Sequence, residues 1–169
     1  MFRESAVPAA LDIPTPPSTA ADHDAARRLV IESRFGTLAV AAENALTFPR
    51  GLLGFEEYRA YALAELSERR YAQFRVLQCL DDHKLAFLVL PLDPEAGAVD
   101  RGDLAMACAN LDIPIDDLGV LLIVTIRRDA EGNPQVSANL RAPLLIDTKR
   151  RLGAQYVFPS DSYPVRFPI

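Results

Sequence analysis

The sequence has few of the residues on which most enzyme and metal sites depend. Its 169 residues include no tryptophan, two cysteines (Cys79 and Cys108) and two histidines (His23 and His83). Two cysteines are too few for a disulfide framework, and without a regular spacing to a histidine they do not indicate a zinc site. We therefore expect no metal or other cofactor. Cys79 lies inside an apolar run, where a buried, reduced thiol is expected.

Long hydrophobic runs are also missing. The longest, residues 118–126, has about half the length that a bilayer-spanning helix needs. The N-terminus reads Met-Phe-Arg-Glu and meets Pro8 and Pro14 before any apolar run develops, so no signal peptide is expected. These features predict a soluble cytoplasmic protein with no membrane partner.

The chain carries less positive than negative charge. It has 18 Lys and Arg and 23 Asp and Glu, which give a formal net charge of −5. A protein that binds nucleic acid has to neutralise phosphates, and an acidic domain has the wrong sign for that task. We therefore expect no direct nucleic-acid binding. The same charge favours rapid association with a basic protein partner.

The groups for catalysis are sparse as well. A nucleophile needs an adjacent base and a third, orienting group, and no such set surrounds either cysteine or the serines. The glycines form no phosphate-binding loop. A hydrolase built on Asp81, Asp82 and His83 is the remaining catalytic alternative, but paired acids in loops are more often surface or turn residues. We expect a protein-binding protein with no catalytic residues and no small-molecule substrate.

The first part of the chain differs from the rest. Residues 1–28 are rich in proline and alanine and are expected to form a flexible tail, with a short, weak helix possible over 20–28. The ordered domain is expected to span residues 29–169.

Short runs of β-forming residues between turn signals dominate that domain. The segment 59–66 fits either a strand or a helix, and residues 93–118 are expected to be an irregular acidic connection with one helical turn at 114–118. The strand at 119–128 is apolar on both faces and is predicted to be central. The pattern predicts a mainly β fold, a compact antiparallel β-barrel-like single domain with one or two short helices. The predicted strands are 33–40, 45–48, 73–80, 85–90, 119–128, 135–140, 143–146 and 154–158.

Three segments are specific enough to indicate a family. They are FPRGLLGFE at 48–56, LQCLDDHKLAFLVL at 77–90, and SANLRAPLLI at 137–146 with YPVR at 163–166. In order and spacing they resemble the FliW flagellar assembly factors, over residues 33–169. The chain departs from the family pattern at Leu53, where proline is usual, and at His83-Lys84, where proline is common.

The resemblance implies a compact antiparallel β-barrel without known catalytic activity. It also implies two protein partners, flagellin before its export from the cytoplasm, and CsrA, a small RNA-binding translational repressor. Free FliW sequesters CsrA from flagellin mRNA, and flagellin that accumulates captures FliW and releases CsrA. The net negative charge of the chain suits a basic partner such as CsrA.

Eight residues are candidate partner contacts. For several of them a structural role is an equal alternative, because acids in turns often accept hydrogen bonds from the backbone. Arg141 either anchors an acidic partner or pairs with Asp81 or Glu56, and it is expected to share one strand face with Asn139. The candidates are Glu56, Asp81, Asp82, Asp112, Asp116, Asp117, Asn139 and Arg141.

Two further surfaces have competing interpretations. The acidic stretch 93–117 is either a solvated connection or the negative surface that attracts CsrA, and the basic run 149–151 is expected to be a solvated turn. A small barrel that binds RNA itself remains an alternative, because such barrels place aromatic rings among basic residues. The only region with this composition contains Tyr58, Tyr61, Tyr71 and Phe74 near Arg59, Arg69, Arg70 and Arg75.

Overall fold

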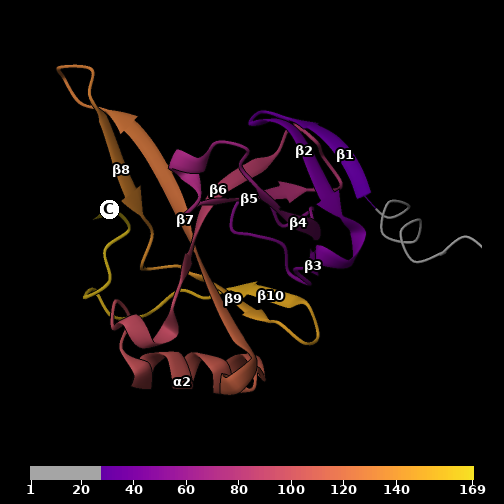
Figure 1. The fold of residues 1–169 in the computed structure, drawn as a ribbon. Helices are drawn as coiled ribbons and strands as arrows, with labels where there is room; N and C mark the ends of the chain where they lie inside the picture. Colours follow the sequence, from indigo (N-terminus) through magenta and orange to yellow (C-terminus); the bar gives the residue numbers. More distant parts are fainter. Residues whose placement is uncertain (1–27) are drawn as a thin grey trace, which may run out of the picture.

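A computed structural model describes residues 28–169, which begin with a separate β-hairpin (Figure 1). Strands β1 (Arg28–Ser33) and β2 (Gly36–Ala41) pair antiparallel in a two-stranded sheet. The single strand predicted at 33–40 is therefore wrong, because the chain reverses at residues 34–35 and Gly36 adopts a φ of 96°. The expected tail and the helix at 20–28 lie outside the described residues, except for Arg28, which begins β1.

The main sheet has the hydrogen-bonded order β11-β8-β7-β6-β5-β4-β3-β10-β9, and β9 pairs again with β7. The ring from β7 round to β9 is therefore closed, which confirms the mainly β, barrel-like fold. Every pair is antiparallel except β10 with β3, which are parallel at Leu152 and Thr47. The strands are β3 (Ala45–Thr47), β4 (Ala60–Glu65), β5 (Arg75–Cys79), β6 (Ala86–Leu92), β7 (Leu118–Arg128), β8 (Pro134–Ala138), β9 (Leu144–Asp147), β10 (Leu152–Gln155) and β11 (Phe167–Pro168).

The structure decides the open points of the strand prediction. The segment 59–66 contains strand β4, and the predicted hairpin at 73–90 is confirmed as β5 and β6. The strand predicted at 154–158 is displaced, because the turn after β9 ends at Arg151, with a φ of 56°, and pairing with β9 resumes at once. β7 is central, since it pairs with β6, β8 and β9.

The expectation of an irregular connection at 93–118 is wrong, because helix α2 (Arg101–Leu111) occupies much of it. The Asp100 side chain accepts hydrogen bonds from the amides of Gly102 and Asp103, which caps the first turn. Leu104, Ala107 and Cys108 then form a buried face with helical spacing. The helical turn expected at 114–118 is confirmed as η4 (Ile115–Asp117), and the other 3₁₀ turns are η1 (Ala42–Asn44), η2 (Arg69–Tyr71) and η3 (Pro94–Ala96).

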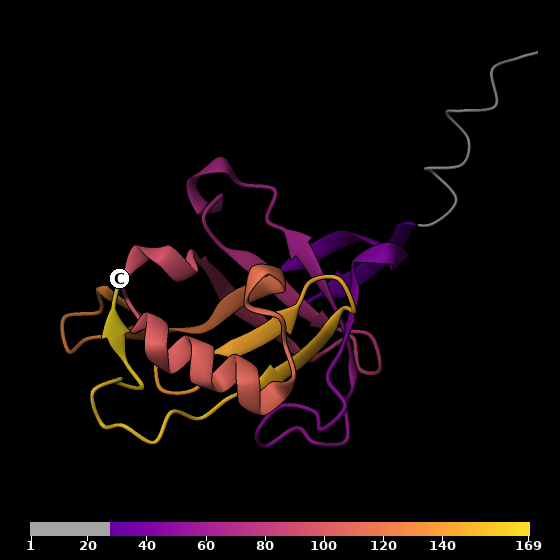
Figure 2. The same cartoon turned by 90° about the horizontal axis from the view of Figure 1, so that it is seen from below.

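Strand β7 divides the core into two parts, because its successive side chains point to opposite faces. Leu121 belongs to the cluster inside the barrel, which also holds the buried rings of Phe48 and Tyr61 in edge-to-face contact. Val120 and Leu122 belong to the cluster beneath α2, with Leu104, Ala107 and Phe158. Figures 1 and 2 show α2 lying across this outer face of the sheet.

Both cysteines are buried and free, as expected for Cys79. Burial raises the pKa of the Cys79 thiol, and the same cause raises the pKa of Cys108. The two thiols are therefore packing groups in the core rather than reactive surface groups.

Candidate protein-binding groove

A groove of about 580 Å³ lies between the 49–56 loop, the end of α2 and strand β10. We call it the β10 groove. Three of its lining side chains are large, apolar and exposed: Leu53 (57%), Leu152 (39%) and Val157 (50%). A second hollow of about 560 Å³ is lined by apolar side chains that include Leu46, Leu121 and Ile146, which are buried in the barrel core. Exposed apolar side chains gathered in a groove indicate a surface for another molecule, so the β10 groove is the candidate site.

The 49–56 loop is held tightly beneath the groove. Phe48 and Leu52 are fully buried and anchor it to the barrel core. Gly51 adopts a φ of 68° and donates its amide to the Phe48 carbonyl at 2.8 Å, and the Phe55 amide donates to the Leu52 carbonyl at 2.8 Å. The loop therefore presents Leu53 to solvent on a fixed backbone.

Two further hydrogen bonds fix the tip of this loop. Glu56 Oε1 accepts from the Gly54 amide at 3.0 Å, and this backbone bond lowers the pKa of Glu56. The structure thus shows the backbone cap, one of the two alternatives for Glu56. The Leu53 amide donates to Gln155 Oε1 at 3.0 Å. Proline has no amide hydrogen, so this link to the end of β10 requires a residue other than proline at position 53.

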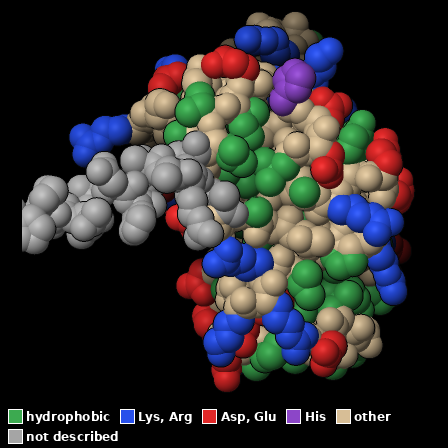
Figure 3. Space-filling model, turned by 90° about the vertical axis from the view of Figure 1, so that its right-hand side faces the viewer, with side chains coloured by type: hydrophobic (Ala, Val, Ile, Leu, Met, Phe, Trp, Pro, Cys, Tyr) green, Lys and Arg blue, Asp and Glu red, His purple; other side chains and the backbone are tan. Residues whose placement is uncertain are grey.

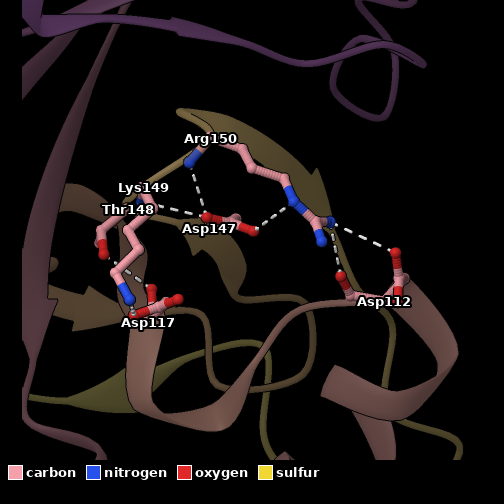
Figure 4. Close-up of polar contacts among 6 residues, drawn as sticks. All are labelled: Asp112, Asp117, Asp147, Thr148, Lys149 and Arg150. Atoms are coloured by element: carbon pink, nitrogen blue, oxygen red, sulfur yellow. Dashed lines mark hydrogen bonds and ion pairs between the residues drawn. The ribbon is translucent and has the colours of Figure 1, made fainter.

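Asp147 and Arg150, which both line the groove, face each other (Figure 4). Asp147 is 2% exposed, and its Oδ1 accepts the amides of Lys149 (3.0 Å) and Arg150 (2.8 Å). Its Oδ2 lies 3.4 Å from Arg150 Nε and has no hydrogen bond. Arg150 Nη1 also donates to the Asp112 carbonyl at 2.9 Å and to Asp112 Oδ2 at 3.3 Å. Arg150 therefore joins β9, the turn after it and the end of α2.

Beside this pair, the basic turn holds the acidic stretch in place. Lys149 Nζ lies 2.8 Å from Asp117 Oδ1, and this contact raises the pKa of Lys149. The Thr148 amide and hydroxyl both donate to the Asp117 carbonyl, at 2.9 and 2.8 Å. Residues 149–151 form the exposed turn that was expected, but Lys149 and Arg150 are engaged in ion pairs. The acidic stretch is therefore partly neutralised at Asp112 and Asp117, while Asp116 is exposed.

Only some of the eight candidate partner contacts predicted from the sequence lie at the β10 groove. Glu56 and Asp112 line it, and Asp117 is tied to the adjoining turn. Asp81 lies at the β5–β6 hairpin, where its Oδ2 accepts the amides of Arg59 (3.0 Å) and Ala60 (3.1 Å). Asp82 Oδ1 accepts the Lys84 amide at 2.9 Å. Both acids therefore accept hydrogen bonds from backbone amides, as the structural alternative predicts, and a partner contact by either one stays a prediction.

Asn139 and Arg141 do not share a strand face, because β8 ends at Ala138 and both follow in the turn. Asn139 Oδ1 accepts the Ala142 amide at 3.0 Å. Arg141 pairs with Asp161 and donates from Nε to the Tyr163 carbonyl at 3.3 Å, so it contacts neither Asp81 nor Glu56. It fastens the C-terminal segment to the barrel, a contact that sequence spacing alone does not reveal.

The aromatic region considered for RNA presents only part of its rings to solvent. Tyr71 is 38% exposed, with the Arg70 guanidinium 4.8 Å from its ring centroid. Tyr61 is fully buried and Phe74 is 9% exposed, so neither ring can stack on a base.

Of the residues in the hydrolase alternative, Asp81 and Asp82 each accept backbone amides through one carboxylate oxygen. Within residues 28–169 no three His, Cys, Asp or Glu side chains are grouped so as to hold a metal ion.

Replacing Asp81 with alanine tests its structural role directly. We expect the free energy of unfolding to fall by about 1 kcal/mol, because the Arg59 and Ala60 amides lose their acceptor. Urea denaturation of Asp81→Ala measures this, with Asp116→Ala, at an exposed position, as the matched control. An Asp81→Ala protein with unchanged stability but weaker partner binding would show that Asp81 is a partner contact instead.

Of the residues that line the groove, the predicted set contains only Glu56 and Asp112. Those it missed include Leu53, Asp147, Arg150, Leu152 and Val157. Leu53 carried a signal, since it departs from the usual proline of its motif. The others lie within residues 147–157, and only the tertiary fold places this stretch beside Leu53 and the end of α2.

Comparisons with known proteins agree with this architecture. The family model described as FliW protein matches residues 29–169. Flagellar assembly factor FliW of Leptospira interrogans is 34% identical over 135 residues, which cover 78% of this chain and 86% of the relative. The Syntrophus aciditrophicus protein of the same name is 32% identical over 141 residues, 81% of this chain and 84% of the relative.

A solved structure shows the same fold. The crystal structure of the flagellar assembly factor FliW superposes with a TM-score of 0.60 at 21% identity, covering 83% of this chain and 95% of that chain. In the described part of the present chain no helix is long and apolar enough to cross a membrane. The family match over residues 29–169 and the relatives above 30% identity show that this chain belongs to the FliW family.

Proposed function

We propose that this protein is a cytoplasmic flagellar assembly factor that binds newly made flagellin and antagonises the translational repressor CsrA. The observation that carries the proposal is the match to the FliW family over residues 29–169, with curated relatives named flagellar assembly factors. In this role the chain couples flagellin synthesis to export by exchanging one protein partner for the other, and it catalyses no reaction.

The surface suits protein binding. The β10 groove combines exposed apolar side chains with charged ones, the composition of a protein interface with an apolar centre and a polar rim. On the face seen in Figure 3, hydrophobic side chains gather in patches bordered by Lys, Arg, Asp and Glu. The net charge of −5 favours association with a basic protein and repels RNA phosphates.

A pull-down from the native bacterium tests the proposal. Tagged full-length protein is recovered from lysate before and after flagellin export is blocked, and bound proteins are quantified by mass spectrometry. We expect CsrA in the first sample, and more flagellin with less CsrA in the second, because retained flagellin competes for the same protein. A lysate without the tagged protein is the control. Recovery of neither partner above this control in either sample would contradict the proposed function.

A further inference from the structure

The carboxylate of Asp147 has binding capacity that the fold does not use. Its side chain is 2% exposed, and Oδ1 already accepts two backbone amides. Oδ2 is buried and accepts no hydrogen bond. A buried carboxylate is unfavourable unless it is paired and hydrogen-bonded on both oxygens. Asp147 lines the β10 groove, but Oδ2 is buried beside Arg150, so a donor that entered the groove would reach this oxygen only when Arg150 moves aside.

The present partner of that oxygen is weakly placed. Arg150 Nε lies 3.4 Å from Asp147 Oδ2 without forming a hydrogen bond, and the rest of its guanidinium is directed to Asp112. The Arg150 side chain is half exposed, and the Asp112 side chain is 93% exposed. The exposed Arg150–Asp112 pair contributes little to stability, so Arg150 can move away from Asp112 at small cost. The buried Asp147 carboxylate still needs a cation, so Arg150 can leave it only when another cation takes its place.

The walls of the groove select for apolar groups. Leu53 comes from the 49–56 loop, and Leu152 and Val157 come from β10 and the residues directly after it; the three are 57%, 39% and 50% exposed. They lie round the groove that Asp147 also lines. Covering them with apolar side chains removes their surface from water, which favours binding. An apolar protein segment that carries one cationic side chain fits both the apolar walls and the Asp147 carboxylate.

We propose that the β10 groove binds such a segment of CsrA, and that a lysine or arginine of this segment replaces Arg150 at Asp147. The inference rests on the proposed function and names the surface that this function would use. CsrA is favoured over flagellin because an RNA-binding protein has to present Lys or Arg to neutralise phosphates. Arg150 acts in this scheme as an internal competitor that occupies the anionic site of the free protein.

The two members of the ion pair should have opposite effects on affinity, and this is the test. Binding of purified CsrA to the full chain is measured by isothermal titration calorimetry at one fixed salt concentration. We expect Asp147→Asn to weaken binding by about fivefold or more, because the charge that receives the cation is lost. We expect Arg150→Gln to tighten binding roughly threefold, because the internal competitor is removed.

Lys149→Gln is the matched control for charge. It removes the same positive charge from the same turn, but Lys149 pairs with Asp117 and does not line the groove. We expect it to change CsrA affinity by less than about twofold. Equal tightening by Lys149→Gln and Arg150→Gln would show a general effect of net charge and overturn the proposed exchange at Asp147.

A matched pair of variants also tests the apolar walls of the groove. Leu53 and Ile126 are both 57% exposed, but only Leu53 lines the groove. We expect Leu53→Ser to weaken CsrA binding by about fivefold and Ile126→Ser to leave it unchanged. Wild-type affinity in Leu53→Ser and Arg150→Gln overturns the inference, even if Asp147→Asn fails to fold. Wild-type protein that does not bind CsrA contradicts the proposed function instead.

Discussion

Replacement of Gly51 by alanine is expected to lower the free energy of unfolding by about 3 kcal/mol or more. A Cβ atom at this position would lie 2.5 Å from the Glu56 Cα, 2.7 Å from the Phe55 carbonyl oxygen and 2.8 Å from the Glu56 carbonyl carbon. All three are backbone atoms, so no side chain can rotate away and the 49–56 loop has to open. The φ of 68° adds a further cost of about 1 kcal/mol for any residue with a Cβ.

Gly54 provides the control within the same motif. Its φ is 82°, but a Cβ there would meet no atom within 4 Å. Gly54→Ala should therefore cost only about 1 kcal/mol from the backbone conformation. Guanidinium denaturation of both variants separates the two causes, because only Gly51→Ala includes the steric clash. Equal losses for the two variants would show that the loop accommodates a Cβ at Gly51 and is not held as tightly as its contacts indicate.

The same loop shows how far a sequence motif predicts function. The glycines and Phe55 are typical of a tight turn, and the structure has a positive φ at Gly51 and Gly54 and packs Phe55 against the barrel core. The motif alone does not indicate that Leu53 points into a groove, because the opposite walls come from α2 and from β10. Glu56 has two interpretations, a backbone cap and a partner contact. The hydrogen bond from the Gly54 amide shows the cap, and the partner contact stays a prediction because Glu56 also lines the groove.

The acidic connection at residues 93–118 shows a second limit of prediction from the sequence. Its seven acids suggested an irregular, solvated stretch, yet Asp100 is a helix cap and Leu104, Ala107 and Cys108 follow with helical spacing. Because acidic residues are frequent in this segment, the helical spacing of its apolar residues is hard to recognise from the sequence. The ion pairs of Asp112 and Asp117 with Arg150 and Lys149 join residues more than 30 positions apart, and only the tertiary fold brings them together. Short-range turn chemistry was more predictable, as Asp81 and Asp82 show.

Replacement of Phe158 by alanine is expected to destabilise the protein by about 3–5 kcal/mol. The ring is 2% exposed and packs between Tyr156 and Tyr163, with centroid distances of 5.3 and 4.8 Å. It belongs to the cluster that joins α2 to β7 and β9. Removing it leaves a cavity beneath the helix, because the backbone bond from the Phe158 amide to the Arg141 carbonyl holds the chain in place.

Phe158→Ala should lower the local stability of helix α2 more than that of the barrel strands. We expect the amides of α2 to exchange faster with deuterium in Phe158→Ala, while β4 and β5, whose contacts lie in the other clusters, change less. Phe167→Ala is the matched control, since it removes the same side chain from a position that is 43% exposed. Its cost should be below about 1 kcal/mol. If both variants lost the same stability and α2 stayed protected, the helix would be held by contacts other than Phe158, and one end of the β10 groove would not depend on this ring.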